Sequence, residues 1–250
     1  MNAALTHIKL MLILCFCSVL ISAQCKADTS TTAVSANNYQ QLFTQTADKA
    51  QLVALSQKLN LGETVRGNFV QSRQLKVLKK PLISQGQFIF DQTQGLIWQQ
   101  IKPFESLLIL KDKQLIQRDS QGRVQVSKAD ASTSAAAMGD LLPSLVRAML
   151  GGDISGLSEN FELHFLIADR LSPDGQWQLG LTPKDPLMKK AIANMVLEGS
   201  DVLQSLVLLS AAPSVAQQDM TRIDFSALSQ GKLSETELTQ YAVAIEANKP

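Results

Sequence analysis

The sequence predicts an α+β fold built on one large antiparallel sheet. Short runs with a period of two recur about eleven times along the chain, and the connections between most of them are only a few residues long. Helical spacing is confined to the start, the middle and the end. Because parallel strands need crossovers of a dozen or more residues, consecutive strands here are expected to be antiparallel neighbours.

The first 27 residues have the pattern of a secretory signal peptide. A weakly basic start precedes an apolar run from Leu10 to Ile21, and cleavage fits after Ala27. This run is shorter than the ~20 residues that a membrane-spanning helix needs. We therefore expect export and a periplasmic location. An uncleaved anchor and lipidation at Cys25 stay open as alternatives, although Gln24 is an unusual residue before a lipidated cysteine.

All three cysteines lie inside this leader, at positions 15, 17 and 25. The mature chain would therefore lack disulfides, a thiolate nucleophile and cysteine metal sites. Its basic and acidic residues are nearly balanced, so no basic field is expected that would hold nucleic acid or an acidic membrane surface. We expect no cofactor, no metal and no enzyme activity, and recognition through apolar contacts or shape.

The segment 28–44 is rich in Ser, Thr, Ala and Asn and lacks periodicity, which predicts a disordered lead-in. A single domain is expected over 45–250. At its start, leucines recur at helical intervals from Gln45 to Leu59, which predicts an amphipathic helix. Gly62 follows as a helix stop.

Strands are then expected in two groups. The first covers 65–73, 82–90, 96–101, 106–111, 114–119 and 123–128, and the second covers 162–168, 176–182, 193–198, 203–211 and 220–227. Gly86, Phe88 and Phe90 fall on one face of their strand because side chains alternate.

A helical segment, Ser132–Leu150, separates the two groups. Pro143 predicts a kink within it. Its apolar line is rich in methionine and has small residues beside it, which makes an adaptable surface. That line consists of Met138, Leu141, Leu145 and Met149. A short helix over Asp185–Lys190 and a last helix after the capping box Ser234–Glu237 complete the expected elements.

Two strand segments, Leu107–Leu110 and Leu206–Leu209, are apolar on both faces. A sheet of eleven strands must curl, split or close. Continuous apolar strands indicate that both faces are covered. Two explanations stay open here: helices that cap a dry core, or an apolar ligand cavity on the concave face.

Four motifs, in order, resemble those of the LolA-type periplasmic lipoprotein carriers. They are Gly67–Arg73 with Phe69 and Gln71, Ser84–Phe90, Leu96–Trp98 with Pro103 five residues on, and Gln176–Lys184 with its Leu-Thr-Pro-Lys turn. The resemblance covers roughly 46–227. It implies an incomplete β-barrel of about eleven strands, closed by a helical lid, whose apolar interior carries acyl chains of a lipoprotein from the inner to the outer membrane.

The resemblance also implies the candidate site, which has no catalytic residue. The candidate cavity and lid residues are Phe69, Phe88, Phe90, Trp98, Leu108, Leu110, Met138, Leu141, Leu145, Met149, Phe165 and Trp177, with Ile223 and Phe225 as further candidates for the lining. Which strand face is concave stays open, because a one-residue slip reverses every assignment. The implied partners of a monomeric carrier are lipoprotein or lipid cargo, an inner-membrane donor complex and an outer-membrane acceptor.

One position departs from the family. An arginine followed by proline fastens the lid in the carriers, and Gln92 stands at the aligned position here. Glutamine lacks the charge and the five-donor fork of arginine. We therefore expect a divergent paralogue of the kind found beside lipid-biosynthesis genes, with lipid or glycolipid as possible cargo. Four arginines are predicted surface charges, one of which could replace the latch: Arg73, Arg118, Arg147 and Arg222.

Two other functions are considered. An outer-membrane-assembly scaffold or anchored docking module would use the same sheet as a binding surface. A periplasmic acyl hydrolase would depend on His164, the one histidine left after the leader. Such a base needs a serine and a carboxylate around it, and the sequence has no Gly-x-Ser-x-Gly elbow.

Overall fold

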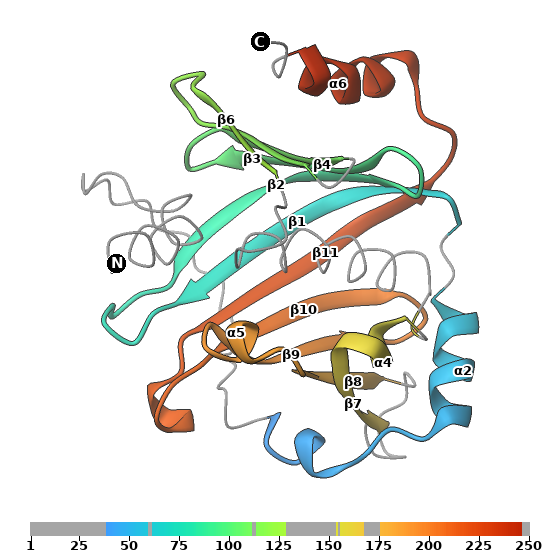
Figure 1. The fold of residues 1–250 in the computed structure, drawn as a ribbon, viewed down its shortest axis with the longest axis vertical. Helices are drawn as coiled ribbons and strands as arrows, with labels where there is room; N and C mark the ends of the chain where they lie inside the picture. The colour runs from blue at the N-terminus through green and yellow to red at the C-terminus, as the bar shows by residue number, and fades with distance from the viewer. Residues whose placement is uncertain are drawn as a thin grey trace. The chain divides into compact units, whose positions relative to one another are not determined.

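The computed structural model describes residues 39–59, 62–111, 114–128, 154, 156–167 and 176–246. Eleven strands form one antiparallel sheet that does not close into a barrel, which confirms the predicted class (Figure 1). The strands are β1 (Thr64–Gln74), β2 (Leu82–Asp91), β3 (Gly95–Lys102), β4 (Ser106–Lys111), β5 (Gln114–Arg118), β6 (Val124–Lys128), β7 (Phe161–Ile167), β8 (Trp177–Pro183), β9 (Ile192–Gly199), β10 (Leu203–Ser210) and β11 (Met220–Gln230).

The sheet consists of two meanders joined at their first and last strands. Its order is β6-β5-β4-β3-β2-β1-β11-β10-β9-β8-β7, so β1 and β11 are central neighbours. They pair from Val65 opposite Gln230 to Gln74 opposite Met220, with a register shift between Arg66 and Asn68. All other strand pairs join strands that follow one another in the chain, as short connections predict.

Short helices surround the sheet: η2 (Leu42–Thr44), α2 (Lys49–Lys58), α4 (Leu157–Asn160), α5 (Pro186–Lys189), η3 (Val215–Gln217) and α6 (Glu235–Glu246). Helix α2 begins four residues later than predicted. Asp48 is its N-cap and accepts a hydrogen bond from Ala50 N at 2.8 Å, while Gln51 Oε1 accepts one from Asp48 N. This capping box fixes the helix start.

The last helix begins at its predicted capping box. Glu237 N donates to Ser234 Oγ at 3.2 Å, and Ser234 N donates to Glu237 Oε2 at 2.7 Å. Tyr241 of α6 is fully buried against the convex face, with Ile97, Ile109 and Ile116. Its hydroxyl lies 3.1 Å from the carbonyl oxygens of Ile89 and Gly95, so one O–H anchors α6 to the sheet.

The folded part begins earlier than expected. Residues 39–44 lie within the predicted lead-in but pack against the sheet, and Tyr39 and Leu42 are buried. A Cβ at Gly180 of β8 would lie 2.8 Å from Phe43 and 3.1 Å from Leu42, which shows how closely this segment covers the strand. The apolar side chains of Tyr39, Leu42 and Phe43 outweigh the polar composition around them.

Some predicted elements lie outside the described residues. They are the leader 1–27 with Cys25, most of the lead-in, and the helical segment Ser132–Leu150 with Met138, Leu141, Leu145, Met149 and Arg147. Within the part of the chain that the structure describes, no helix is both long and apolar enough to cross a bilayer.

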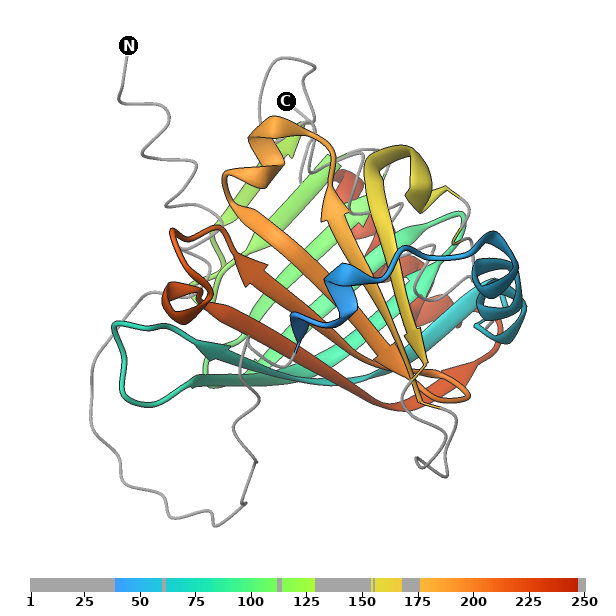
Figure 2. The ribbon, with the colours of Figure 1, turned by 90° about the horizontal axis from the view of Figure 1, so that it is seen from below.

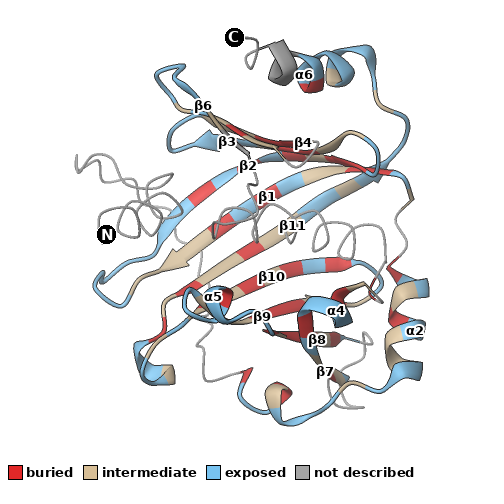
Figure 3. Ribbon diagram, in the orientation of Figure 1, coloured by how far each residue is buried: buried red, intermediate tan, exposed pale blue. Residues whose placement is uncertain are grey.

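The sheet curves strongly, as Figure 2 shows. Leu110 of β4 and Phe161 of β7 belong to one buried cluster although their strands lie near opposite ends of the strand order. Only a curved sheet brings these strands to one core. Buried residues recur at alternate positions along the central strands (Figure 3), as expected for strands that each have an inner and an outer face.

Candidate functional site

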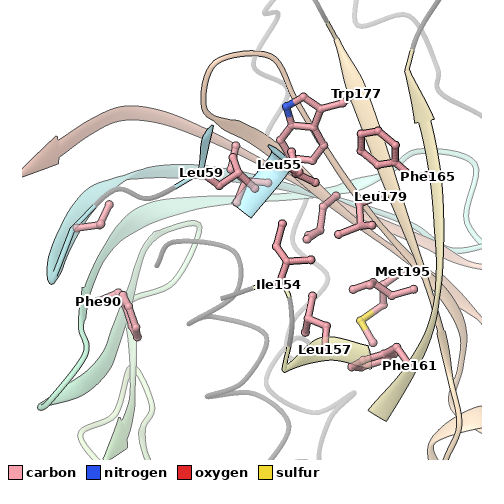
Figure 4. Close-up of a cluster of buried hydrophobic side chains, with 14 of the residues drawn as sticks. Leu55, Leu59, Phe90, Ile154, Leu157, Phe161, Phe165, Trp177, Leu179 and Met195 are labelled. Carbon is pink, nitrogen blue, oxygen red and sulfur yellow. The ribbon is translucent and has the colours of Figure 1, made fainter. Parts of the chain in front are cut away.

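The concave face of the sheet carries a continuous apolar cluster. Strands from both meanders contribute, and Leu55 and Leu59 of the α2 region and Leu157 of α4 point toward them (Figure 4). Its buried members are Leu55, Leu59, Val65, Phe88, Phe90, Leu96, Leu110, Ile154, Leu157, Phe161, Phe165, Trp177, Leu179, Leu181, Met188, Met195, Leu197 and Leu203. A cluster of this size makes the concave face the main apolar surface of the described fold.

Four aromatic rings form an array on this face. Phe69 and Trp98 stack with ring centroids 3.8 Å apart. Phe88 lies 6.1 Å from Trp98, and Phe225 meets both Phe88 and Trp98 edge-on at 5.5 Å and 6.5 Å. Each such pair contributes about 0.5–1.5 kcal/mol beyond area burial. The array therefore fixes the side chains that β1, β2, β3 and β11 present to the concave side.

The structure brings eight of the twelve candidate residues to this face. Phe88, Phe90, Leu110, Phe165 and Trp177 belong to the buried cluster, and Trp98 packs against it. Phe69 stacks on Trp98. Leu108 pairs with Trp98 across β3 and β4 and is half-buried. The four remaining candidates lie in the undescribed helical segment, and ligand binding by all twelve stays a prediction.

Several cluster residues were not predicted as lining. Leu179 and Leu181 on β8, and Met195 and Leu197 on β9, alternate with a period of two. That pattern could have identified them once the face of Trp177 was known. Ile154 and Leu157 precede β7 in an irregular segment, and no periodicity indicated that they are buried.

The concave face also contains polar side chains that are nearly inaccessible. Gln71 of β1 and Ser84 of β2 are directly opposite each other, and both are buried. Ser84 Oγ has no hydrogen-bond partner among the described residues. Unpaired buried hydroxyls are rare, because each loses its hydration without compensation. Within the described part of the chain, this hydroxyl is therefore an unmet polar group beside the aromatic array.

Gln92 lies in an exposed turn between β2 and β3. Its Nε2 donates to Gly62 O at 3.4 Å, and its backbone N donates to Glu63 O at 3.0 Å. The adjacent Asp91 accepts from Thr64 Oγ1 at 2.6 Å and from Thr93 and Gln94. Burial alone would raise the pKa of Asp91, but these hydrogen bonds outweigh it and lower the pKa. Gln92 thus ties this turn to the start of β1.

Arg222 is not a surface charge, so that prediction was wrong. Its side chain on β11 is 24% exposed and donates from Nη1 to Glu198 Oε2 at 2.7 Å, and Glu198 is 18% exposed. Ser205 Oγ donates to the same Glu198 oxygen at 2.7 Å. Burial raises the pKa of Glu198, but the bonds from Ser205 and Arg222 outweigh it, and the pKa is lowered. The sequence showed no sign of this pair because its members are 24 residues apart.

This ion pair holds the N-terminal segment. Tyr39 is buried beside it, with Arg222 Nη1 at 3.4 Å from the Tyr39 hydroxyl. Burial and the Glu198 carboxylate raise the pKa of Tyr39. The network lies on the face opposite the aromatic array, because Arg222 and Phe225 point to opposite sides of β11. It is therefore part of the support behind the concave face.

Among the described residues, His164 contacts a backbone carbonyl, a threonine and a phenylalanine ring. Its Nδ1 lies 3.2 Å from Gln45 O and its Nε2 lies 3.4 Å from Thr182 Oγ1, and Phe43 packs edge-on at 5.3 Å. Both ring nitrogens are thus engaged by a backbone carbonyl and a threonine. Among the described residues, no group of three or more His, Cys, Asp and Glu side chains could hold a metal ion.

A cleft of about 280 Å³ lies on the convex face, beside α6. Its walls include Arg66 and Glu237, which form an ion pair of 2.9 Å, and the carboxamides of Asn68, Gln87 and Gln99. Polar and apolar side chains share this lining, and its ion pair and carboxamides do not suit an acyl chain. The concave face remains the candidate site for an apolar ligand.

A family model matches residues 44–241 and is described as "Outer membrane lipoprotein carrier protein LolA-like". No curated protein matches this chain. The match extends on both sides of the segment 46–227 on which the motifs lie.

Solved structures with a similar fold are distant in sequence. A LolA superfamily protein from Nitrosomonas europaea is 10% identical, with 76% of this chain and 96% of that chain covered and a TM-score of 0.39. A DUF1329 family protein from Desulfovibrio piger is 12% identical, with 74% and 93% covered and a TM-score of 0.39. MucB in the Pseudomonas aeruginosa MucA/MucB complex is 20% identical, with 77% and 60% covered and a TM-score of 0.32.

Proposed function

Because this chain belongs to the LolA-like family of outer membrane lipoprotein carrier proteins, we propose that it is a periplasmic carrier without catalytic activity. Its concave face binds the acyl chains of lipoprotein or lipid cargo and escorts them to the outer membrane. The observation that supports this most directly is the apolar cluster that both meanders present to one side of an open sheet.

The energetics of the cargo require such a face. Each CH₂ exposed to water costs about 0.8 kcal/mol, so a chain of sixteen carbons costs roughly 12 kcal/mol to leave unprotected. Side chains that pack against the cluster but are only partly buried would lose their remaining exposed area on contact with an acyl chain. They include Trp98, Leu115, Leu206, Leu208 and Phe225.

The polar pair on the same face gives the cargo an orientation. Ser84 Oγ is buried without a partner among the described residues, opposite Gln71 and two residues from Gly86. An ester or amide carbonyl at the head of an acyl chain would accept a hydrogen bond from this hydroxyl. In this proposal the aromatic array contacts the acyl chain, and Ser84 contacts its polar head.

The cargo test begins with native mass spectrometry of gently purified protein, which should show an added lipid mass. Binding of a fluorescent fatty-acyl probe is then compared between Trp98→Gln/Leu206→Gln, on the concave face, and Val70→Gln/Ile83→Gln, exposed on the convex face. We expect the first pair to bind the probe about tenfold more weakly, which is a loss of about 1.4 kcal/mol in binding free energy. The second pair should bind it as the wild type does. Protein that carries no lipid and takes up no probe would refute the proposal.

Export and partners belong to the same proposal. We propose cleavage near Ala27, action in the periplasm as a monomer, and exchange with an inner-membrane donor complex and an outer-membrane acceptor. The mass of the mature protein separates the alternatives. A chain that begins at Asp28 supports a free carrier, whereas a diacylglyceryl group on Cys25 supports an anchored docking module.

A further inference from the structure

The turn between β1 and β2 combines exposed apolar side chains with lysines. Residues 75–81 read Leu-Lys-Val-Leu-Lys-Lys-Pro. Val77 is 89% exposed and Leu78 is 43% exposed. Lys76, Lys79 and Lys80 are exposed as well. Single exposed apolar residues are common on protein surfaces, but here two of them stand among three cations at one tip.

This turn extends beyond the paired part of the sheet. The last paired residues are Arg73 opposite Leu82 and Gln74 opposite Met220, so 75–81 pairs with none of the described strands. Figures 1 and 2 both show the hairpin extending past the start of β11. Its backbone is nevertheless held, because Lys76 N donates to Asp219 Oδ1 at 2.8 Å and Leu78 N donates to Leu75 O at 2.9 Å.

The turn between β3 and β4 adds a third apolar side chain at the same end of the sheet. Gln85 pairs with Lys102, so this turn follows directly beside the start of β2. Phe104 is 52% exposed there. Gln100 Nε2 donates to Phe104 O at 2.9 Å and fixes the turn. Val77, Leu78 and Phe104 thus belong to one end of the sheet.

The charge of this hairpin differs from that of the whole chain. No Asp or Glu occurs between Glu63 and Asp91, whereas Arg66, Arg73 and the three turn lysines do. The near balance of the whole chain conceals this local excess. The acidic groups at the tip are Asp219, which is bonded to the turn backbone, and Glu105 in the next turn.

We propose that the β1–β2 turn docks this protein on the surface of an anionic phospholipid bilayer. Lysines near such a surface are attracted by the anionic headgroups, and apolar side chains among them enter the headgroup boundary. Stable attachment takes more than one signal, so a short tip of this kind would give reversible docking. The inference goes beyond carriage of cargo, because it concerns where the protein meets a membrane.

The test measures co-sedimentation of the purified protein with vesicles of phosphatidylcholine, with and without phosphatidylglycerol. We expect binding to the anionic vesicles only, reduced by salt. Lys76→Gln/Lys79→Gln/Lys80→Gln should lower the partition coefficient about a hundredfold, as three surface lysines predict. The control Lys49→Gln/Lys58→Gln/Lys232→Gln removes three lysines elsewhere and should bind like the wild type. Equal loss in both triples, or equal binding to neutral vesicles, would overturn the proposal.

Insertion of the tip is tested with Val77→Trp. Its emission should shift to the blue on anionic vesicles and be quenched by brominated lipid, whereas the wild type, with only Trp98 and Trp177, should change little. Val77→Ser/Leu78→Ser should weaken binding, and Val53→Ser/Val202→Ser should not. An unchanged Val77→Trp spectrum would reject insertion. None of these variants touches the concave face, so all of them should still take up the acyl probe. If the wild type took up no probe, only the carrier function would be rejected.

Discussion

Phe69 and Trp98 stack at 3.8 Å although their strands, β1 and β3, are not neighbours. Strand β2 lies between them, and the residue opposite Phe69 on β2 is Gly86. A Cβ at this glycine would lie 1.9 Å from Gln99 O, so β3 approaches β2 more closely than any side chain at position 86 permits. The stack and the glycine therefore depend on each other.

Gly86→Ala is expected to destabilise the protein severely. The new methyl group meets backbone rather than a flexible side chain, so β3 must shift and the aromatic array must separate. We expect a loss of about 3 kcal/mol or more in the free energy of unfolding, measured with urea. The near-ultraviolet circular dichroism of Trp98 should weaken in parallel.

The neighbouring Gln85→Ala serves as the control. Gln85 is exposed on the opposite face of β2, and its replacement should change the stability by less than about 0.5 kcal/mol. If both variants unfolded at the same urea concentration, the close approach at Gly86 would have no energetic importance.

Ser84→Ala separates the stability of the empty protein from its affinity for cargo. Removal of a buried hydroxyl that has no partner among the described residues should leave stability unchanged or raise it by about 1 kcal/mol. If the hydroxyl binds the head of the cargo, the same variant should bind an acyl ester probe several-fold more weakly. Melting curves and probe titrations measure the two effects. A destabilised Ser84→Ala would show that the hydroxyl already has a partner.

Glu198→Gln should destabilise the protein by about 2 kcal/mol. The change removes the more buried of the two carboxylates that pair with the Arg222 guanidinium and leaves it only Asp224, which lies 2.8 Å from Nε and is 48% exposed. A half-buried charge that loses its buried partner is costly. The matched variant Asp201→Asn removes the exposed pair with Lys58 and should cost less than about 0.5 kcal/mol. Equal urea midpoints for the two variants would contradict the structural role of Glu198.

Stability should fall as the pH is lowered through the acidic range. The pKa of Glu198 is lowered in the folded protein from an ordinary value of 4.5, and that of Asp91 is lowered from 3.8. Such groups contribute stability above their unfolded pKa, and this contribution is lost as the pH falls through the folded pKa. Urea unfolding at about pH 6, 5, 4 and 3 should show a free energy of unfolding that begins to decline near the ordinary carboxyl pKa values. The decline should be shallower in Glu198→Gln.

The sequence predicted the sheet well because its signals are local. Alternation and short turns are properties of neighbouring residues, so all eleven strands, the α5 helix and the α6 capping box were predicted close to their observed places. Gly86, Phe88 and Phe90 are all buried on one face of β2, as their alternation predicted. The family motifs lie on β1, β2, β3 and β8, where each strand carries its own side-chain pattern.

Relations between distant segments could not be predicted. Three features join residues that are far apart in the chain. They are the common cluster of Leu110 and Phe161, the Glu198–Arg222 ion pair, and the packing of Tyr39 and Leu42 against the sheet. A single sequence gives no distance between such residues. For the same reason the sequence does not reveal that Arg222 is buried in an ion pair. The leucine pattern predicts an earlier start for α2 than the Asp48 cap sets.

The pairing of β1 with β11 has a consequence for the order of folding. The pair Val65–Gln230 joins the first strand to the last, so the centre of the sheet stays open until the final strand exists. A chain that emerges with its amino end first can form each meander from local contacts, but its slowest step is the long loop closure between them. Until then β1 and β10 are unprotected strand edges, where another chain can pair. A nascent molecule of this protein would therefore need shielding along β1 longest, at the strand that carries Phe69.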